Sequence, residues 1–371
     1  MRIVYVCADR GIPLRGHKGA SVHLRSLAEA LARRGNHVTV ACQNLSGDNP
    51  QPARVRVESL PAAGDMHEHW LNALFAELGP DVILERYSLS SGPSQAAARS
   101  RGISFVLEVN SPLVEEAARY RGLENVEQWR LRERETLAAA DGVIAVSNPI
   151  KEHVIEMGVD PGRVAVIHNG VNLSSFERAD GGVVRARHGL GRSTVVGFSG
   201  SLKPWHGVES LVQVLDGLPE VRMLIVGDGP ERARLQNLVL DQGLTNRVVF
   251  VGAVTHDQIP DHLAAMDIGA APYLPQDRFY FSPLKVIEYL AAGLPVVASD
   301  QGDMRSLVDG AGILFPAGDP AALAAAIREL ATDGELRGRL SQAARAQARD
   351  RDWLRVAERV EVVLASPKVA A

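Results

Sequence analysis

The sequence has only two cysteines in 371 residues, Cys7 and Cys42, and both lie in apolar, strand-like runs. Two such residues argue against a disulfide framework, and we expect both to be buried and reduced. No apolar run approaches the ~20 residues that a membrane-spanning helix requires. The apolar run 3–8 is also too short for the hydrophobic region of a signal peptide. We therefore expect a soluble, cytoplasmic protein without stable membrane insertion.

The chain also lacks a basic surplus, because its formal net charge is −4. A nucleic-acid partner is thus disfavoured, since such binding needs a basic footprint. Lysine is scarce in particular: five of the 40 basic residues are lysine and the rest are arginine. Three of those lysines, Lys18, Lys203 and Lys285, lie in loops marked by glycine or proline. Lysine presents a compact charge that suits phosphate, so these three are candidate binding residues.

A length of 371 residues indicates two domains of typical size. Residues 1–178 and 194–349 each show apolar strand-like runs that alternate with amphipathic helical patterns. This alternation predicts two α/β domains with parallel sheets. Between them, residues 179–193 lose apolar periodicity and gain glycine, which indicates a linker. Residues 350–371 are predicted to carry a final helix.

The segment 279–295 of the second half predicts a helix that begins with an anion site. Ser282 has the hydroxyl of an N-cap residue, and Pro283 suits the first helical position. A helix N-terminus offers unpaired N–H groups and a positive dipole end, which together suit a phosphate. Lys285 lies in the first turn, and Glu288 lies one turn further on the same face. The alternative is a capped surface helix with an ion pair between Lys285 and Glu288.

Polar residues follow several apolar runs of the first half. A glycine-bearing loop separates the strand predicted at 2–8 from a helix predicted at 21–34, and it lacks the G-x-G-x-x-G pattern of dinucleotide binding. Arg86 follows the strand at 82–84, while Glu108 and Asn110 follow the strand at 104–107. The carboxyl ends of parallel strands are where α/β enzymes keep their sites. Residues 114–140 have mixed charge and are predicted to form one long helical region with a solvated face.

The run SPLKVIEYLAAGLPVV at residues 282–297 resembles the donor-binding segment of the retaining, nucleotide-sugar-dependent glycosyltransferases of family 4. These enzymes are of the "glycosyl transferases group 1" type and have the GT-B fold. Many members carry two glutamates separated by seven residues at this place. Glu288 matches the second glutamate, whereas Tyr280 stands at the first. Near residue 200, Ser201 and His206 stand where the family often has an arginine and a lysine.

The resemblance implies an α/β GT-B fold: two Rossmann-like, doubly wound domains that face a central cleft. Domain 1–178 would be the acceptor side, domain 194–349 would bind the nucleotide sugar, and the helix within 350–371 would cross back to the first domain. The implied reaction moves a hexose-type sugar from a nucleotide-diphosphate sugar to an acceptor, with retention and without a metal or other cofactor. A UDP-sugar is favoured and a GDP-sugar is possible. The acceptor, a small molecule, a glycan or a lipid-linked sugar, stays open, as does the oligomeric state.

The resemblance also implies roles for particular residues. Charge stabilisation of the departing diphosphate would fall to Lys203 and Lys285, and Asn110 would hold a sugar hydroxyl at the reacting centre. The residues implied at the donor diphosphate and sugar are Gly19, Ala20, His206, Tyr280, Phe281, Ser282, Pro283 and Leu284. The residues implied at the nucleoside are Glu288, Gly252 and Val254. The residues implied on the acceptor side are Lys18, Arg86, Glu108 and Glu115.

Alternatives remain open at this stage. Arg86 and Glu108 are equally consistent with a buried ion pair that braces their loops, and Lys18 with a solvated loop. The only D-x-D sequence, Asp350–Asp352, is interpreted as a helix cap and not as a metal site. A sugar-nucleotide epimerase or hydrolase, or a non-catalytic nucleotide-sugar-binding protein, would bind the same donor. An NAD-dependent oxidoreductase is disfavoured by the missing fingerprint.

Overall fold

The computed structural model describes residues 1–61 and 65–366, with the side chains of residues 65 and 66 left out. The chain forms two compact units. The first unit holds Met1–Gly170, Tyr280–Ser282 and the chain from Trp353 onward, and the second holds Val171–Phe279 and Pro283–Asp352. The chain therefore passes from the first unit to the second after Gly170. The sequence pattern places the end of the first domain later, at residue 178. Of the predicted terminal segment 350–371, residues 367–371 lie outside the described residues.

The first unit contains a sheet of seven parallel strands in the order β3-β2-β1-β4-β5-β6-β7. The strands are β1 (Arg2–Cys7), β2 (His37–Cys42), β3 (Arg56–Ser59), β4 (Val82–Arg86), β5 (Ser104–Val109), β6 (Gly142–Ala145) and β7 (Val164–Val166). From β1 the successive strands are added toward one edge of the sheet, and from β4 they are added toward the other edge. The strands β1 and β4 are neighbours and pair with Ile3 opposite Val82. At such a switch point the connecting loops leave in opposite directions and open a crevice at the carboxyl ends of the strands. The pattern missed β3, because this edge strand of four residues has no fully buried side chain.

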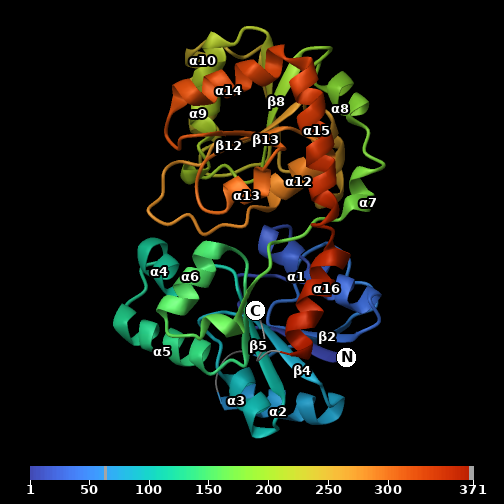
Figure 1. Ribbon diagram of the computed structural model, residues 1–371, viewed down its shortest axis with the longest axis vertical. Coiled ribbons are helices and arrows are strands. Elements are labelled where there is room, and N and C mark those ends of the chain that lie inside the picture. The colour runs from blue at the N-terminus through green and yellow to red at the C-terminus, as the bar shows by residue number, and fades with distance from the viewer. Residues whose placement is uncertain (62–64, 367–371) are drawn as a thin grey trace. The chain divides into compact units, whose positions relative to one another are not determined.

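Helices cover this sheet, and their apolar faces pack on the buried strands (Figure 1). They are α1 (Gly19–Arg33), α2 (Asp65–Leu78), α3 (Pro93–Ser100), α4 (Leu113–Tyr120), α5 (Val126–Ala138), α6 (Asn148–Glu156) and α16 (Trp353–Ala365), with the short 3₁₀ turn η1 (Pro161–Arg163). The single helical region predicted over 114–140 is wrong. It is broken between α4 and α5, where Gly122 and Asn125 take positive φ values of 65° and 53° that a helix cannot continue through.

The second unit contains a sheet of six parallel strands in the order β10-β9-β8-β11-β12-β13. The strands are β8 (Thr194–Ser199), β9 (Val221–Val226), β10 (Val248–Gly252), β11 (Ile268–Ala271), β12 (Val296–Ser299) and β13 (Gly312–Phe315). Its switch point falls between β8 and β11. The helices are α7 (Leu173–Phe176), α8 (Gly181–Arg187), α9 (Val208–Val214), α10 (Arg232–Asp241), α11 (Ile259–Ala264), α12 (Leu284–Ala292), α13 (Met304–Val308), α14 (Pro320–Thr332) and α15 (Gly334–Arg349), with 3₁₀ turns η2 (Pro204–His206), η3 (Leu215–Gly217) and η4 (His256–Gln258).

The structure assigns two segments differently from the sequence pattern. The stretch 179–193, predicted as a linker, contains α8, which packs on α11 in the second unit. Asp350, interpreted as an N-terminal cap of the last helix, is instead the C-terminal cap residue of α15. The last helix, α16, begins at Trp353 and packs on α1 in the first unit.

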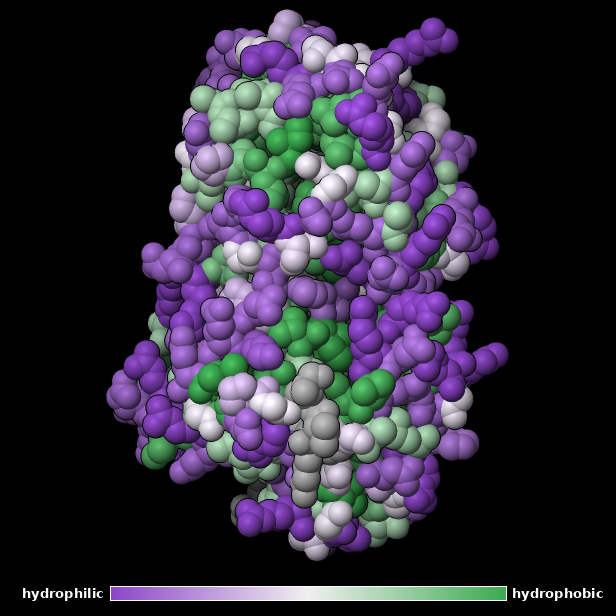
Figure 2. Space-filling view, viewed as in Figure 1, coloured by the Kyte–Doolittle hydropathy of each residue, from purple (hydrophilic) through white to green (hydrophobic). Residues whose placement is uncertain are grey.

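Hydrophilic side chains cover much of the face shown in Figure 2, with hydrophobic ones between them. The exposed large hydrophobic residues come from different elements of the chain, among them Leu131 on α5, Leu240 on α10 and Val362 on α16. Within the described residues, no helix combines the length and the apolar character needed to cross a membrane.

Candidate functional site

Helix α12 begins at Leu284, and no side chain caps its first turn. The prediction that Ser282 is the N-cap is wrong: the N-cap residue is Pro283, whose carbonyl accepts from the N–H of Val286 at 3.0 Å. The Ser282 hydroxyl instead accepts a hydrogen bond from the backbone N–H of Asn169 in the first unit at 3.2 Å. Proline has no hydroxyl to offer, so the N–H groups at the start of α12 are left without the usual side-chain partner.

Lys285 extends from this first turn toward the loop after β8. Its nitrogen lies 4.0 Å from the centre of the Phe198 ring and 5.1 Å from that of Tyr273. That atom is buried, and none of the residues that the structure describes gives it a hydrogen-bond acceptor. Burial lowers the pKa of Lys285 to about 7. A Cβ at Gly200 would lie 3.1 Å from the same nitrogen, so glycine there gives the ammonium room.

Glu288 lies one turn along α12, and its side chain is 14% exposed. Its Oε1 is 3.8 Å from Nδ1 of His256, and no ion pair with Lys285 occurs in the described part of the chain. Burial raises the pKa of Glu288 to about 7, while Lys285 acts in the opposite direction. The alternative of a surface ion pair between the two is thus not what the structure shows. The two groups remain separate, as a cation site and a carboxylate site need to be.

His206 and Lys203 lie on the loop that follows β8. The Nδ1 atom of His206 donates to the carbonyl of Ser201 at 2.5 Å, and the ring packs against Phe198 and Tyr273. Burial, together with the charge of Lys285, lowers the pKa of His206 to about 3, so the ring is neutral near pH 7. Its Nε2 is then a hydrogen-bond acceptor and cannot donate to a phosphate oxygen, which does not suit the place at the diphosphate that the resemblance implies for His206. The Lys203 nitrogen lies 5.8 Å from the centre of the Trp205 ring.

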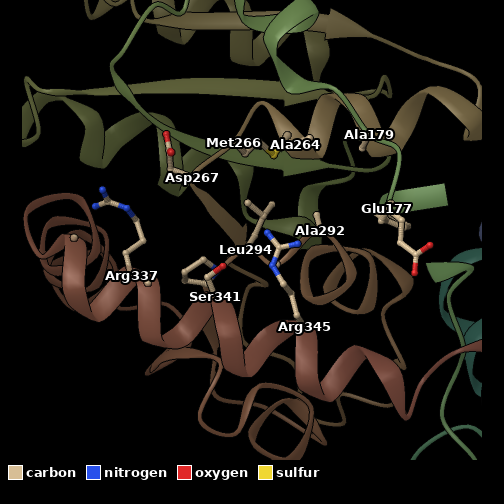
Figure 3. Close-up of a pocket in the computed structure, with 15 residues that line it drawn as sticks. Glu177, Ala179, Ala264, Met266, Asp267, Ala292, Leu294, Arg337, Ser341 and Arg345 are labelled. Carbon is tan, nitrogen blue, oxygen red and sulfur yellow. The ribbon is translucent and has the colours of Figure 1, made fainter. Parts of the chain in front are cut away.

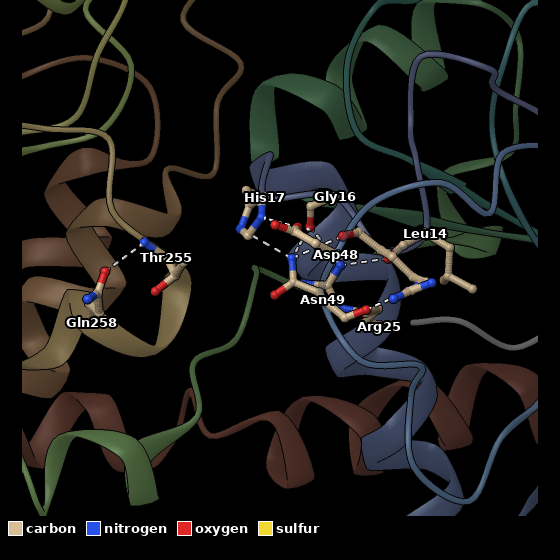
Figure 4. Close-up of polar contacts among 9 residues, drawn as sticks. Leu14, Gly16, His17, Arg25, Asp48, Asn49, Thr255 and Gln258 are labelled. Carbon is tan, nitrogen blue, oxygen red and sulfur yellow. Dashed lines mark hydrogen bonds and ion pairs between the residues drawn. The ribbon is translucent and has the colours of Figure 1, made fainter.

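The two residues expected at the nucleoside lie at the carboxyl end of β10. Gly252 ends that strand with a φ of +91°, and its carbonyl accepts from the N–H of Gly227 at 2.8 Å. Val254 is half-buried in the loop that follows. This loop ends in a capping box between Thr255 and Gln258, drawn in Figure 4, which fixes the start of η4.

In the first unit, the residues expected at the diphosphate form the start of α1. Lys18 is the exposed N-cap residue, and Gly19 and Ala20 open the helix without a capping side chain. The loop before them is held by side chains that the sequence pattern did not single out (Figure 4). Arg25 of α1 donates to the carbonyls of Leu14 and Gly16 at 2.6 and 2.8 Å, and Asn49 donates to Gly16 at 3.0 Å. His17 pairs with Asp48 at 2.6 Å.

Arg86 and Glu108 lie in the core, 8% and 2% exposed, with 3.8 Å between Nη1 and Oε2. The hydroxyl of Tyr5 donates to Glu108 at 2.5 Å, and the Nε2 atom of His23 pairs with the other oxygen of the same carboxylate. Burial by itself raises the pKa of Glu108, but His23 and Arg86 outweigh it, and the pKa falls to about 2. This geometry corresponds to the bracing alternative, because the carboxylate is already fully engaged.

Two further first-unit candidates lie nearer the surface. Asn110 follows β5, and its buried Nδ2 has no hydrogen-bond partner among the described residues. An unpaired amide donor is costly to bury, so Nδ2 is suited to donate a hydrogen bond to a ligand oxygen. Glu115 on α4 is 44% exposed, with its carboxylate 4.0 Å from Nδ1 of the buried His153.

Tyr280, Phe281 and Ser282 belong with the first unit, although the chain continues directly into α12. The rings of Tyr280 and Phe281 lie 4.4 Å apart. The hydroxyl of Ser147 donates to the carbonyl of Tyr280 at 2.7 Å. The segment is therefore fixed by residues that follow β6 and β7.

A cavity of about 440 Å³ lies at the carboxyl ends of β1, β2 and β4. The lining residues follow these strands or belong to the region around α4: Ala8, Asp9, Arg10, Gln43, Ser88, Leu89, Ser90, Leu113 and Arg121. Hydroxyl, amide, carboxylate and guanidinium groups thus surround one opening at the switch point of the sheet. Such a lining suits a small polar molecule with many hydroxyl groups.

Comparison with known proteins identifies the family. Residues 17–175 match the family described as "Glycosyltransferase Family 4", and residues 193–333 match "Glycosyl transferases group 1". A D-inositol 3-phosphate glycosyltransferase of Streptomyces avermitilis is 31% identical over 319 residues, which cover 80% of this chain and 68% of that protein. The chain belongs to glycosyltransferase family 4.

Other relatives of this glycosyltransferase show the range of the family. The 2-deoxystreptamine glucosyltransferase of Streptomyces kanamyceticus is 27% identical over 236 residues, 60% of this chain and 59% of that protein. The crystal structure of Anabaena Alr3699/HepE in complex with UDP has a TM-score of 0.80 at 22% identity and covers 99% of this chain and all of that one. The same Anabaena protein has also been solved with UDP-glucose. The likeness in structure confirms the predicted GT-B fold, with a Rossmann-like domain in each unit.

A second cavity of the glycosyltransferase, about 520 Å³, lies at the amino ends of β11 and β12 in the second sheet (Figure 3). Asp267, which lines it, directly precedes β11, and Leu294 lies just before Pro295 and β12. Ser341 and Arg345 project toward the cavity from α15. A Cβ on Gly293, the C-cap residue of α12, would lie 2.5 Å from the guanidinium of Arg345, so glycine there makes room for this group. A cation there complements the negative end of the helix dipole. We therefore assign Arg345 a role in ending α12, and this cavity lies away from the uncapped N-terminus of the helix.

No group of three or more histidine, cysteine, aspartate or glutamate side chains suited to a metal ion occurs among residues 1–61 and 65–366 of this glycosyltransferase. The residues that sequence reasoning missed are Arg25, Asn49 and His23, whereas Asn169 is part of the turn signal Asn169-Gly170. Nothing in the local sequence marks the first three, because each acts on a segment distant along the chain.

Proposed function

We propose that this glycosyltransferase transfers a hexose from a UDP-sugar to a small polyhydroxylated acceptor, with retention of the anomeric configuration and without a metal ion. The UDP complex of the Anabaena neighbour supports the nucleotide. The names of the Streptomyces relatives support a cyclitol-type acceptor.

The observation that carries the proposal is the unpartnered nitrogen of Lys285 at the uncapped start of α12. A diphosphate placed there receives backbone N–H groups, the positive end of the helix dipole and one ammonium. These groups stabilise the negative charge that grows on the leaving diphosphate as the glycosidic bond breaks. Glu288, one turn further, accepts hydrogen bonds from the ribose hydroxyls.

The first-unit residues bear on the stereochemistry. Asn110 follows β5, and its amide is neutral and cannot act as a general base. A mechanism that depends on charge stabilisation of the diphosphate, with no strong base at the acceptor, is that of a retaining enzyme. A metal ion is not needed if lysine and helix N–H groups neutralise the diphosphate.

The cavity of about 440 Å³ in the first unit is the proposed acceptor site. Arg10 and Arg121 suit an acceptor with a phosphate, such as D-inositol 3-phosphate. Asp9 in the same lining favours a second candidate, an acceptor with an amino group such as 2-deoxystreptamine. Both are small rings with several hydroxyl groups.

A binding screen followed by a product assay tests the proposal. Thermal shifts with UDP, GDP, ADP and dTDP identify the nucleotide, because a ligand that binds only the folded state raises its stability. We expect the largest shift with UDP. The purified protein is then incubated with UDP-glucose and UDP-N-acetylglucosamine, each with D-inositol 3-phosphate or 2-deoxystreptamine, with and without EDTA.

We expect a new glycoside with the α-configuration of the donor, read from the anomeric coupling constant in the NMR spectrum, at the same rate with EDTA. A β-product would overturn retention, and loss of activity in EDTA would overturn metal independence. Free sugar or an epimer in place of a glycoside would establish the hydrolase or epimerase alternative, and UDP binding without any turnover would establish a binding protein.

A further inference from the structure

Asn169 holds the segment Tyr280–Ser282 by two hydrogen bonds. Its Nδ2 donates to the carbonyl of Ser282 at 2.6 Å, and its backbone N–H donates to the hydroxyl of the same residue at 3.2 Å. Both residues are buried, and 113 positions separate them in the sequence. The next residue, Pro283, is already the N-cap of α12. Asn169 therefore fixes the residue just before the N-cap of α12, while Ser147 holds the carbonyl of Tyr280 two residues earlier.

His23, on α1, fixes the orientation of that asparagine. Its Nδ1 lies 2.6 Å from Oδ1 of Asn169, and because the amide Nδ2 must face the Ser282 carbonyl, the group that faces His23 is the amide oxygen. Nδ1 of His23 therefore carries a hydrogen. The ring is 4% exposed and is held edge-on against the Trp353 ring of α16 at 5.2 Å.

The other ring nitrogen of His23 pairs with the carboxylate of Glu108. That carboxylate also accepts from the Tyr5 hydroxyl at 2.5 Å and has Arg86 3.8 Å away, so it is held in its ionised, acceptor-only form. Both nitrogens of His23 then face acceptors, and the ring cannot flip without losing both contacts. The result is one continuous chain of contacts: Tyr5, Glu108, His23, Asn169, Ser282.

We propose that His23 is a positioning residue which, through Asn169, fixes Tyr280–Ser282 in the conformation that recognises the sugar of the bound donor. This inference rests on the proposed function and on the family resemblance, which implies that Tyr280–Ser282 lies at the donor sugar. The nucleotide, by contrast, is held by Lys285 and Glu288, which pack on other residues: Lys285 on Phe198 and Tyr273, and Glu288 beside His256. Breaking the chain of contacts should thus weaken recognition of the sugar and spare recognition of the nucleotide.

The test compares two ligands, UDP and UDP-glucose, by isothermal titration calorimetry. His23→Gln removes the imidazole ring, which contacts Glu108 and Asn169 at the same time. Asn169→Asp keeps an acceptor for His23 but removes the amide donor to Ser282. We expect each variant to bind UDP as the wild type does and to bind UDP-glucose about three- to tenfold more weakly, the equivalent of about one lost hydrogen bond. The double variant should be no weaker than the singles, because both changes interrupt one chain of contacts.

His67→Gln is the matched control, because His67 is a buried first-unit histidine, 1% exposed, whose Nδ1 has no hydrogen-bond partner within the described chain. We expect it to bind both ligands like the wild type. If both test variants bind UDP-glucose like the wild type, or lose UDP and UDP-glucose equally, the positioning role is wrong. If His23→Gln does not fold, Asn169→Asp alone decides. A wild-type protein that does not bind UDP would instead overturn the proposed function, and this inference with it.

Discussion

The side-chain nitrogen of Lys285 lies 4.0 Å from the centre of the Phe198 ring, on the ring face and away from any hydrogen-bond acceptor of the described residues. The negative face of an aromatic ring attracts a cation but replaces only part of its hydration. Lys285 is therefore available to bind an anion, because it forms no ion pair within the described part of the chain. Its position gives the first predictions.

Removing either Lys285 of α12 or Lys203 of the loop after β8 should slow turnover. Lys285→Ala and Lys203→Ala are each expected to lower kcat about 10–100-fold, the size of one lost contact to the departing phosphate. The measurement is UDP release in the presence of donor and acceptor. Lys151→Ala on α6 is the control and should retain the wild-type rate. Near-normal rates in both variants would mean that neither lysine stabilises the departing diphosphate.

Binding of UDP should draw a proton into the site above pH 7. Burial lowers the pKa of Lys285 to about 7, so at pH 8 the amine is largely neutral and must gain a proton to pair with the diphosphate. Affinity should then weaken by up to about tenfold per pH unit above 7. Glu288, whose pKa is raised to about 7, is by then largely ionised, so the uptake belongs to the lysine.

Calorimetry of the UDP complex at pH 8 in Tris and in HEPES measures this uptake, because the two buffers release protons with different enthalpies. We expect close to one proton per UDP in the wild type and none in Lys285→Ala. Equal heats in both buffers for the wild type would contradict this account.

Loss of the negative charge of Glu288 should weaken recognition of the ribose of the nucleotide in particular. Glu288→Gln is expected to weaken UDP binding about tenfold or more, because hydrogen bonds to a charged acceptor contribute ~1.5–3 kcal/mol. The wild type should bind 2′-deoxy-UDP more weakly than UDP, and this preference should shrink in the variant. Glu209→Gln, on α9, is the matched control because Glu209 pairs with Arg234 at the surface of the same unit. An unchanged Kd for UDP in Glu288→Gln would remove the ribose assignment.

Glu85 should make the protein less stable as the pH rises. It is buried between the hydroxyls of Ser91 and Ser94, no cation pairs with it in the described part of the chain, and burial raises its pKa to about 7. Between about pH 4.5 and 7 the folded state keeps this proton and the unfolded state loses it, so the free energy of unfolding falls across that window. Glu85→Gln should remove this contribution, on the order of 3 kcal/mol at pH 8.

Urea unfolding of the wild type and Glu85→Gln at several pH values from 4.5 to 8 checks the prediction. We expect the free energy of unfolding of Glu85→Gln to rise relative to that of the wild type as the pH increases toward 8. A constant difference over this range would mean that Glu85 is ionised in the folded protein at all these pH values.

Much of the fold could be predicted from local pattern. Runs such as Val82–Leu84 and Met223–Val226 are apolar because both faces of a parallel sheet are covered, and the helical pattern between such runs gives the α/β class. Local pattern failed where a short segment depends on its neighbours. The edge strand β3 has too few buried side chains to be recognised, and the pattern of mixed charge concealed the break between α4 and α5.

The candidate site divides in the same way. The sequence by itself determined the family, the parallel α/β architecture and the position of Lys285 and Glu288 on one helix face, because each of these follows from residues close together in the chain. Only the tertiary structure decided that Ser282 bonds to Asn169 instead of capping α12, and that Glu108 is held by Tyr5 and His23. Those contacts join segments more than 80 residues apart, where periodicity carries no information about which side chains meet.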